Sequence, residues 1–180
     1  GMRRFNWKMN LRLNYGFPLT RPALPVVERY YAGGDSSTRG YDADALRAEE
    51  VRAPIGPLSG EPAYRTAPVG GNARLLSQLE WEFAITPKIG GWPWVGALFL
   101  DTGAVFDGFQ RMSWNDVRFS VGISLLRLLT QFGALSLDYA YPLVLPGQLP
   151  LVQSERWKRE PWYAHFPGRI HFNWGMPISL

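Results

Sequence analysis

The first segment of the chain alternates without interruption between apolar and polar residues, and this pattern restricts the fold more than any other feature. From Phe5 to Phe17 every odd position is apolar and every even position is polar or glycine. Successive side chains of a β-strand point to opposite sides, so a period of two residues predicts a strand with one apolar and one polar face. The end of the chain repeats the pattern, with apolar residues at the even positions from Ile170 to Leu180.

Four further segments alternate in the same way, and no stretch has the spacing of an amphipathic helix. The sequence therefore predicts an all-β fold, an antiparallel meander of six strands. These strands are expected over residues 3–18, 73–85, 93–107, 114–128, 132–144 and 168–180. The connection between the first two, residues 19–72, is much longer than the loops of most compact domains, which indicates a loop with a function of its own.

Two kinds of protein use strands with one apolar face. A transmembrane barrel turns the apolar residues toward lipid, whereas a soluble antiparallel sheet turns them toward a core. The polar faces of this chain carry mostly small and amide residues, and aromatic residues lie near several strand ends, as in the aromatic girdles of membrane barrels. These aromatic residues are Trp7, Tyr15, Trp94 and Tyr141. Both observations favour the transmembrane barrel.

The composition argues against several classes of function. The chain has no cysteine, which excludes a disulfide framework, a thiolate metal site and a thiol nucleophile. Its net charge is +4, but the basic residues form no tract, so we expect no binding to nucleic acid. The two histidines, His165 and His171, lie in no nucleophile or metal motif. We therefore predict no enzymatic activity, no cofactor and no metal site.

Inside the long connection, residues 29–41 read Arg-Tyr-Tyr-Ala-Gly-Gly-Asp-Ser-Ser-Thr-Arg-Gly-Tyr. Gly33 and Gly34 tolerate positive φ, and the side chains of Asp35 and the following serines form hydrogen bonds with their own backbone in turns. This composition predicts a tight bend that presents Arg39. Taken alone, such a run is more often an ordinary surface turn than a functional loop.

The run from Gly33 to Tyr41 resembles the "GGD-x-S-x-RGY/F" signature in the sixth extracellular loop of BamA/TamA-type barrels. These barrels belong to the bacterial surface antigen and outer-membrane protein assembly factor superfamily. Three other stretches resemble the same family in the same order, namely residues 70–80, 99–103 and 132–142. The resemblance covers nearly the whole chain and is closest in cadence to TamA-like members.

The resemblance implies that the chain is the C-terminal portion of a transmembrane β-barrel of about sixteen strands in the bacterial outer membrane. Residues 19–72 would be an extracellular loop that folds back into the lumen, where Arg39 would contact Glu80 and Asp101. Both carboxylates fall on the polar phase of their strands, and Glu82 shares that phase and is an alternative partner for Arg39. The implied loop motif comprises Gly33, Gly34, Asp35, Arg39, Gly40 and Tyr41.

The family plan also implies that the final strand borders a weak lateral seam. Gly175 and Pro177 lie in this strand, and proline belongs on a strand edge because it has no N–H to donate. Two positions depart from the family pattern: the chain ends in Leu180 rather than an aromatic residue, and Ala134 stands where the family has proline.

The implied function is that of an insertase or translocase that assists the assembly of outer-membrane proteins. Its partners would be outer-membrane lipid, client proteins and upstream periplasmic domains. Gly1 before Met2 is typical of tag cleavage, so we expect the natural protein to begin upstream. A two-partner secretion pore and a soluble lipid-binding β domain remain alternatives. Six strands leave two open edges, so we expect that this segment does not close a barrel by itself.

Overall fold

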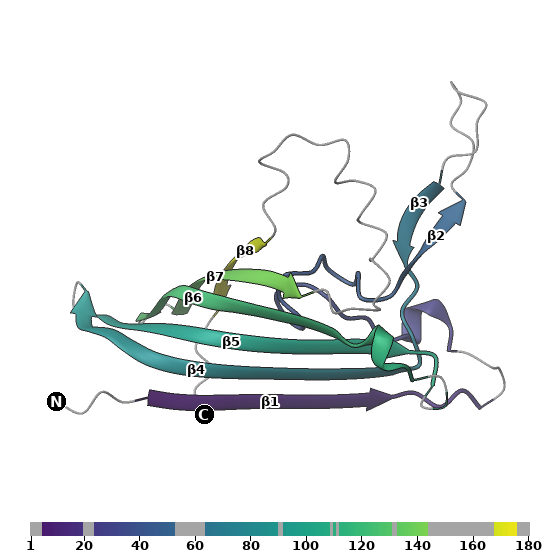
Figure 1. The fold of residues 1–180 in the computed structure, drawn as a ribbon, viewed down its shortest axis with the longest axis horizontal. Helices are drawn as coiled ribbons and strands as arrows, with labels where there is room; N and C mark the ends of the chain where they lie inside the picture. Colours follow the sequence, from purple (N-terminus) through teal and green to yellow (C-terminus); the bar gives the residue numbers. More distant parts are fainter. Residues whose placement is uncertain are drawn as a thin grey trace, which may run out of the picture.

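The computed structural model describes residues 5–19, 24–52, 64–89, 92–108, 110, 112–130, 133–143 and 168–175. Six of its strands form one antiparallel sheet in the order β1-β4-β5-β6-β7-β8, which confirms the predicted all-β meander. In Figure 1 these strands lie side by side, and part of the segment that connects β1 to β4 lies over one face of the sheet. The strands are β1 (Phe5–Tyr15), β4 (Ala73–Ile89), β5 (Trp92–Phe106), β6 (Arg118–Thr130), β7 (Gly133–Leu143) and β8 (Arg169–Gly175).

The long connection contains structure that the alternation pattern did not predict. The short strands β2 (Ala48–Arg52) and β3 (Tyr64–Pro68) pair with each other in a separate hairpin. A single turn of 3-10 helix, η1 (Val26–Glu28), precedes them. Such short elements have too few residues for a periodic signal, which is why the sequence indicated only one long loop.

Two ends of the main strands differ from the expected bounds by four residues each. β6 begins four residues later than position 114, because Trp114–Asp116 form a 3-10 turn that the Ser113 side chain caps by accepting a hydrogen bond from the Asn115 N–H. β4 runs past Pro87 to Ile89, through a stretch where its register with β5 shifts. Proline is tolerated at such irregularities because a ladder hydrogen bond is already missing there.

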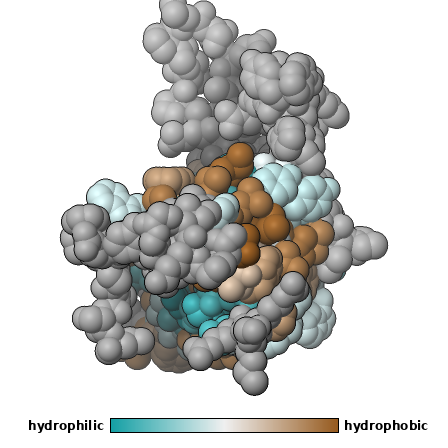
Figure 2. Space-filling view, turned by 90° about the vertical axis from the view of Figure 1, so that its left-hand side faces the viewer, coloured by the Kyte–Doolittle hydropathy of each residue, from teal (hydrophilic) through white to brown (hydrophobic). Residues whose placement is uncertain are grey.

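The two faces of the sheet are reversed relative to those of a soluble protein. The alternating apolar residues of β1 and β8 are exposed, as the 68% exposed fraction of Trp7 illustrates. In β5, β6 and β7 the polar residues of the opposite phase are buried instead, and Asp101 is 0% exposed. A soluble sheet buries its apolar phase, so this arrangement favours the lipid-facing interpretation. Figure 2, an end view from the side where β1 begins, shows hydrophilic residues near the centre and hydrophobic residues around them.

A small apolar cluster joins the long connection to the polar face. Leu76 of β4 and Val105 of β5 belong to the otherwise polar phase, and Ala32, Tyr41 and Leu46 pack over them. Burial of these apolar side chains helps to hold the connection against the sheet, in addition to its polar contacts. Among the described residues, no helix is long and apolar enough to cross a membrane.

The exposed apolar face leads to a prediction about β1. Leu11→Arg places a charge on the outward face at a residue that is 61% exposed. Near the bilayer midplane this substitution is expected to lower the free energy of unfolding by about 2–4 kcal/mol. The measurement is a denaturant titration of the complete barrel in lipid vesicles.

Asn10→Arg is the matched control, because it adds the same side chain to the opposite face one residue away. It removes only an exposed hydrogen bond from Asn10 to Gln78, so its cost should stay below about 1 kcal/mol. Equal destabilisation by both substitutions would contradict a lipid-facing odd phase.

Candidate functional site

The motif in the long connection forms the tight bend that its composition predicts. Gly33 and Gly34 have φ values of 120° and 88°, a region that side chains with a Cβ rarely adopt. The Ser37 hydroxyl closes the bend, since it accepts a hydrogen bond from the Gly33 N–H and donates one to the Gly33 carbonyl, both at 2.8 Å. Asp35 lies exposed in the turn. The bend therefore directs Arg39 toward the polar face of the sheet.

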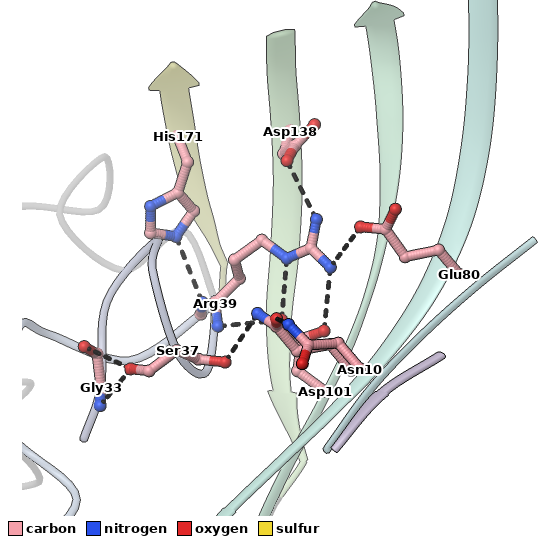
Figure 3. A network of polar contacts seen from close by, with 10 residues as sticks. Asn10, Gly33, Ser37, Arg39, Glu80, Asp101, Asp138 and His171 are labelled. Atoms are coloured by element: carbon pink, nitrogen blue, oxygen red, sulfur yellow. Dashed lines mark hydrogen bonds and ion pairs between the residues drawn. The ribbon is translucent and has the colours of Figure 1, made fainter. Parts of the chain in front are cut away.

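Arg39 is buried against the sheet and forms a forked pair with Asp101 of β5. Its Nε donates to Asp101 Oδ2 at 2.8 Å and its Nη2 donates to Oδ1 at 2.9 Å. The backbone N–H of Arg39 also donates to Asp101 Oδ2, at 3.1 Å. Two parallel bonds between a planar guanidinium and a carboxylate restrict orientation as well as position. Figure 3 shows this arrangement.

Two further carboxylates and an aromatic ring complete the surroundings of the guanidinium. Glu80 of β4 lies 2.9 Å from Nη2, and Asp138 of β7 lies 3.1 Å from Nη1. The ring of Phe99 lies beneath, with its centroid 3.5 Å from the Arg39 Cζ. A cation over an aromatic face is attracted by the ring quadrupole. One guanidinium thus contacts side chains from three strands of the sheet.

The electrostatics of the cluster keep Arg39 charged. Burial alone lowers the pKa of Arg39, but its hydrogen bonds to Asp101 and the charges of Asp101, Glu80 and Asp138 outweigh burial and raise that pKa above its ordinary value. Three carboxylates face this one guanidinium, and Asp101 and Asp138 are almost fully buried. Loss of the cation would leave buried negative charges facing one another without compensation.

Neighbouring motif residues extend the contact to β6, β7 and β8. The Gly40 N–H donates to His171 Nε2 of β8 at 3.2 Å. The Tyr41 hydroxyl donates to the Phe119 carbonyl at 2.9 Å, with the Leu143 carbonyl at 3.3 Å, and burial raises the pKa of Tyr41 to about 12. Gln78 Nε2 of β4 donates to the Ser37 carbonyl at 2.9 Å. The motif therefore contacts every strand from β4 to β8.

The structure brings together most of the site residues that the sequence indicated. Arg39 meets both Asp101 and Glu80, while Glu82, the alternative partner, pairs with Lys8 of β1 at 2.8 Å. Gly175 pairs with Ala134 at the end of β8, and Pro177 lies outside the described residues.

Sequence reasoning missed Asp138, Phe99 and His171 as partners of the motif. Asp138 carried a usable signal, because it is an acidic residue on the polar phase of a predicted strand. Phe99 and His171 carried none, since an aromatic ring or an imidazole on a polar phase has no defined partner until the register is known. Cross-strand pairing places Asp138 opposite His171 and Glu80 opposite Phe99.

The chemistry available to this cluster is structural. A guanidinium does not release its proton at physiological pH, so Arg39 does not act as a general acid or base. Among the described residues, no group of three or more potential ligands has the arrangement of a metal site. The arrangement suits a fixed ionic lock between the loop and the strands, and we call Arg39, Glu80, Asp101 and Asp138 the Arg39 lock.

Comparison with known proteins places this geometry in context. A family model described as the Omp85 superfamily domain matches residues 2–176. The outer membrane protein assembly factor BamA of Nitratidesulfovibrio vulgaris is 30% identical over 121 residues. That alignment covers 67% of this chain and 13% of the relative, so the chain spans only a small part of that protein's length.

The Arg39 lock predicts strong energetic coupling. Arg39→Ala should lower the free energy of unfolding by about 3–5 kcal/mol, because it leaves buried carboxylates unpaired. Arg39→Lys should recover little of this loss, since an ammonium lacks the planar fork. A double-mutant cycle with Asp101→Ala, measured by denaturant titration of the complete protein, should show non-additivity above about 1.5 kcal/mol.

The pair between Arg47 and Asp107 is the matched control, because it joins the loop to the residue that follows β5 but is only partly buried. Its cycle should give less than about 1 kcal/mol. Additive effects of Arg39→Ala and Asp101→Ala would contradict the lock.

A second prediction concerns the space beneath the loop. A Cβ at Gly103 of β5 would overlap the Thr38 hydroxyl and the Leu46 side chain. Gly103→Ala should therefore displace the loop and lower the free energy of unfolding by about 1–3 kcal/mol. Gly108→Ala is the control, because a Cβ there meets nothing within 4 Å. Thermal unfolding and amide exchange in residues 33–41 would measure both effects, and an unperturbed loop in Gly103→Ala would contradict the packing.

Proposed function

This chain belongs to the Omp85 superfamily, and we propose that it forms the C-terminal part of a barrel that assists the insertion of other β-barrel proteins. The superfamily acts in the bacterial outer membrane, in the assembly and translocation of outer-membrane proteins. We propose that the polar face of the sheet lines the barrel lumen and that the loop folds back over it. The role is mechanical, so no enzymatic step is assigned to any residue.

The observation that carries this proposal is the Arg39 lock. Strands of a sheet are held directly only by their neighbours, whereas this loop contacts β4, β5, β6, β7 and β8 through one short motif. An insertase has to expose a strand edge to a client while the rest of its wall stays intact. The Arg39 lock suits this requirement, because it connects β4, β5 and β7 to one another without adding backbone pairing at the edge of the sheet.

The outward face supports lipid as a partner. Trp81 of β4 stacks on Phe5 and Trp7 of β1, with ring centroids 5.6 Å and 5.9 Å apart. These rings lie at the end of the sheet where β1 begins, on the exposed apolar face. Aromatic residues gather in girdles where a barrel meets the membrane–water boundary. We propose that this aromatic cluster anchors that end of the barrel at the boundary.

Two alternatives make different use of the same surfaces. A two-partner secretion pore would pass an unfolded polypeptide along the polar face, which the loop covers here. A soluble lipid-binding domain would bury its apolar phase, whereas Trp7, Met9 and Leu11 are each more than half exposed. The exposed apolar face therefore weighs against the soluble alternative, and a transport assay separates the other two.

The proposal predicts that client insertion depends on the lock. With the complete protein reconstituted in lipid vesicles, Arg39→Ala should slow the folding of an added β-barrel client about tenfold, a change of about 1.4 kcal/mol in the barrier. Arg47→Ala, which opens the more exposed ion pair, should retain a rate close to that of the unmodified protein. The rate is read from the heat-resistant folded client over time.

The insertase proposal is wrong if Arg39→Ala leaves the rate of client folding unchanged although amide exchange shows that the loop is released. Export of an unfolded polypeptide into the vesicles, with no effect on client folding, would support the secretion pore instead.

A further inference from the structure

The geometry points to a second fastening between the loop and the sheet, in which Gly40 and Asp42 clasp β8 through His171 and Arg169. We call these four residues the β8 clasp. Its significance for client insertion rests on the proposed function, but its existence as a restraint on β8 does not. The clasp makes His171 and Arg169 positioning residues for the last described strand.

The first half of the clasp is the hydrogen bond between Gly40 and His171. A backbone N–H only donates, so His171 Nε2, 3.2 Å away, accepts and carries no proton. The proton of the neutral ring then lies on Nδ1. The backbone at Gly40 runs close to β6 and β7, because an added Cβ there would lie 3.3 Å from both the Pro142 nitrogen and the Ser120 Cβ. The preceding residue, Arg39, is bonded to Asp101 through its backbone and side chain, so the Gly40 donor lies beside an anchored residue.

The second half is the ion pair between Asp42 and Arg169. Arg169 Nη1 lies 2.5 Å from Asp42 Oδ1, and the two side chains are 43% and 41% exposed. Arg169 and His171 are two residues apart on one strand, so they project from the same face of β8. An exposed ion pair contributes little by itself. Together with the hydrogen bond, it gives the loop two adjacent points of attachment on one strand.

β8 depends on such attachments more than the interior strands of the sheet do. All of its described residues, Arg169–Gly175, pair with β7. β4 has seventeen residues and lies between two partners, β1 and β5. Within the described part of the chain, β8 lies at the edge of the sheet with one neighbour. A strand that pairs on one side only opens more readily than the interior strands.

The clasp also adjoins the Arg39 lock. Arg39 and Gly40 are consecutive, and Asp138, which pairs with Arg39, stands directly opposite His171 in the register of β7 and β8. Figure 3 shows His171 and Asp138 on adjacent strands on either side of Arg39. A displacement of the loop that breaks the lock would therefore withdraw the Gly40 donor and loosen β8. In the proposed function, this loosening frees an edge to pair with an extended client strand.

Amide hydrogen exchange of the complete protein in lipid nanodiscs tests the clasp. In the double variant His171→Leu/Arg169→Gln, exchange of the β8 amides should rise about five- to tenfold, as expected for the loss of one hydrogen bond and a weak ion pair. Exchange in β4 and β5 should stay unchanged. His171→Gln should stay near the unmodified rate, because its amide oxygen also accepts a hydrogen bond.

Asn173→Leu is the matched control, since Asn173 lies on the same face of β8, two residues beyond His171. It should leave the β8 rates within about twofold, which is less than the loss of one hydrogen bond produces. The clasp is overturned by unchanged β8 exchange in the double variant, by an equal rise in Asn173→Leu, or by equal rises in His171→Leu and His171→Gln. A uniform rise over all strands also overturns it, because it would show general destabilisation.

The exchange measurement needs no client, so it separates the clasp from the proposed function. If β8 exchange responds as expected but client folding does not change in the same variants, the clasp stands and its link to insertion fails. If client folding requires Arg39 but the amide exchange rates of β8 do not change in the His171 and Arg169 variants, the insertase proposal stands and the clasp is wrong.

Discussion

The rest of the structure depends on one buried cation, the guanidinium of Arg39 among Asp101, Glu80 and Asp138. Neither side of this interaction is stable where it lies without the other. Asp101 is fully buried because the loop covers it, and a buried carboxylate without a partner is costly. The loop in turn loses conformational freedom when it is ordered, and the forked pair helps to offset that loss. The charges therefore account for both the position of the loop and the polar character of the covered face.

The sheet accommodates this cation because its faces are reversed. Apolar side chains point away from the loop, to the side that faces lipid in the proposed barrel, so the polar residues are free to gather on the side that the loop covers. That side is not uniformly polar, since Leu76 and Val105 provide a small apolar platform under Tyr41 and Leu46. The absence of a side chain at Gly103 leaves room for Thr38 to approach. Shape and charge thus act together, and the loop fits only where both are satisfied.

The contacts of the loop divide the sheet into parts with different restraints. β4, β5 and β7 contribute carboxylates to the lock, whereas β1 is tied to β4 by its own pair of Lys8 and Glu82. β8 receives the proposed clasp, which is weaker because it consists of a single hydrogen bond and an exposed ion pair. In the proposed function, a graded set of restraints of this kind suits a barrel wall that opens at β8 while β4, β5 and β7 stay connected by the lock.

The alternation of apolar and polar residues by itself determined the all-β meander and the outward phase of each strand, because the two-residue period is a local property. The loop motif, through its family resemblance, also indicated Arg39 with Glu80 and Asp101. The local pattern did not reveal the 3-10 turn at Trp114–Asp116, the β2–β3 hairpin or the continuation of β4 past Pro87. Only the tertiary structure decided that Asp138, Phe99 and His171 surround the loop. The fold of the loop over the sheet brings together residues as far as 131 positions apart, such as Gly40 and His171, and no local periodicity contains that information.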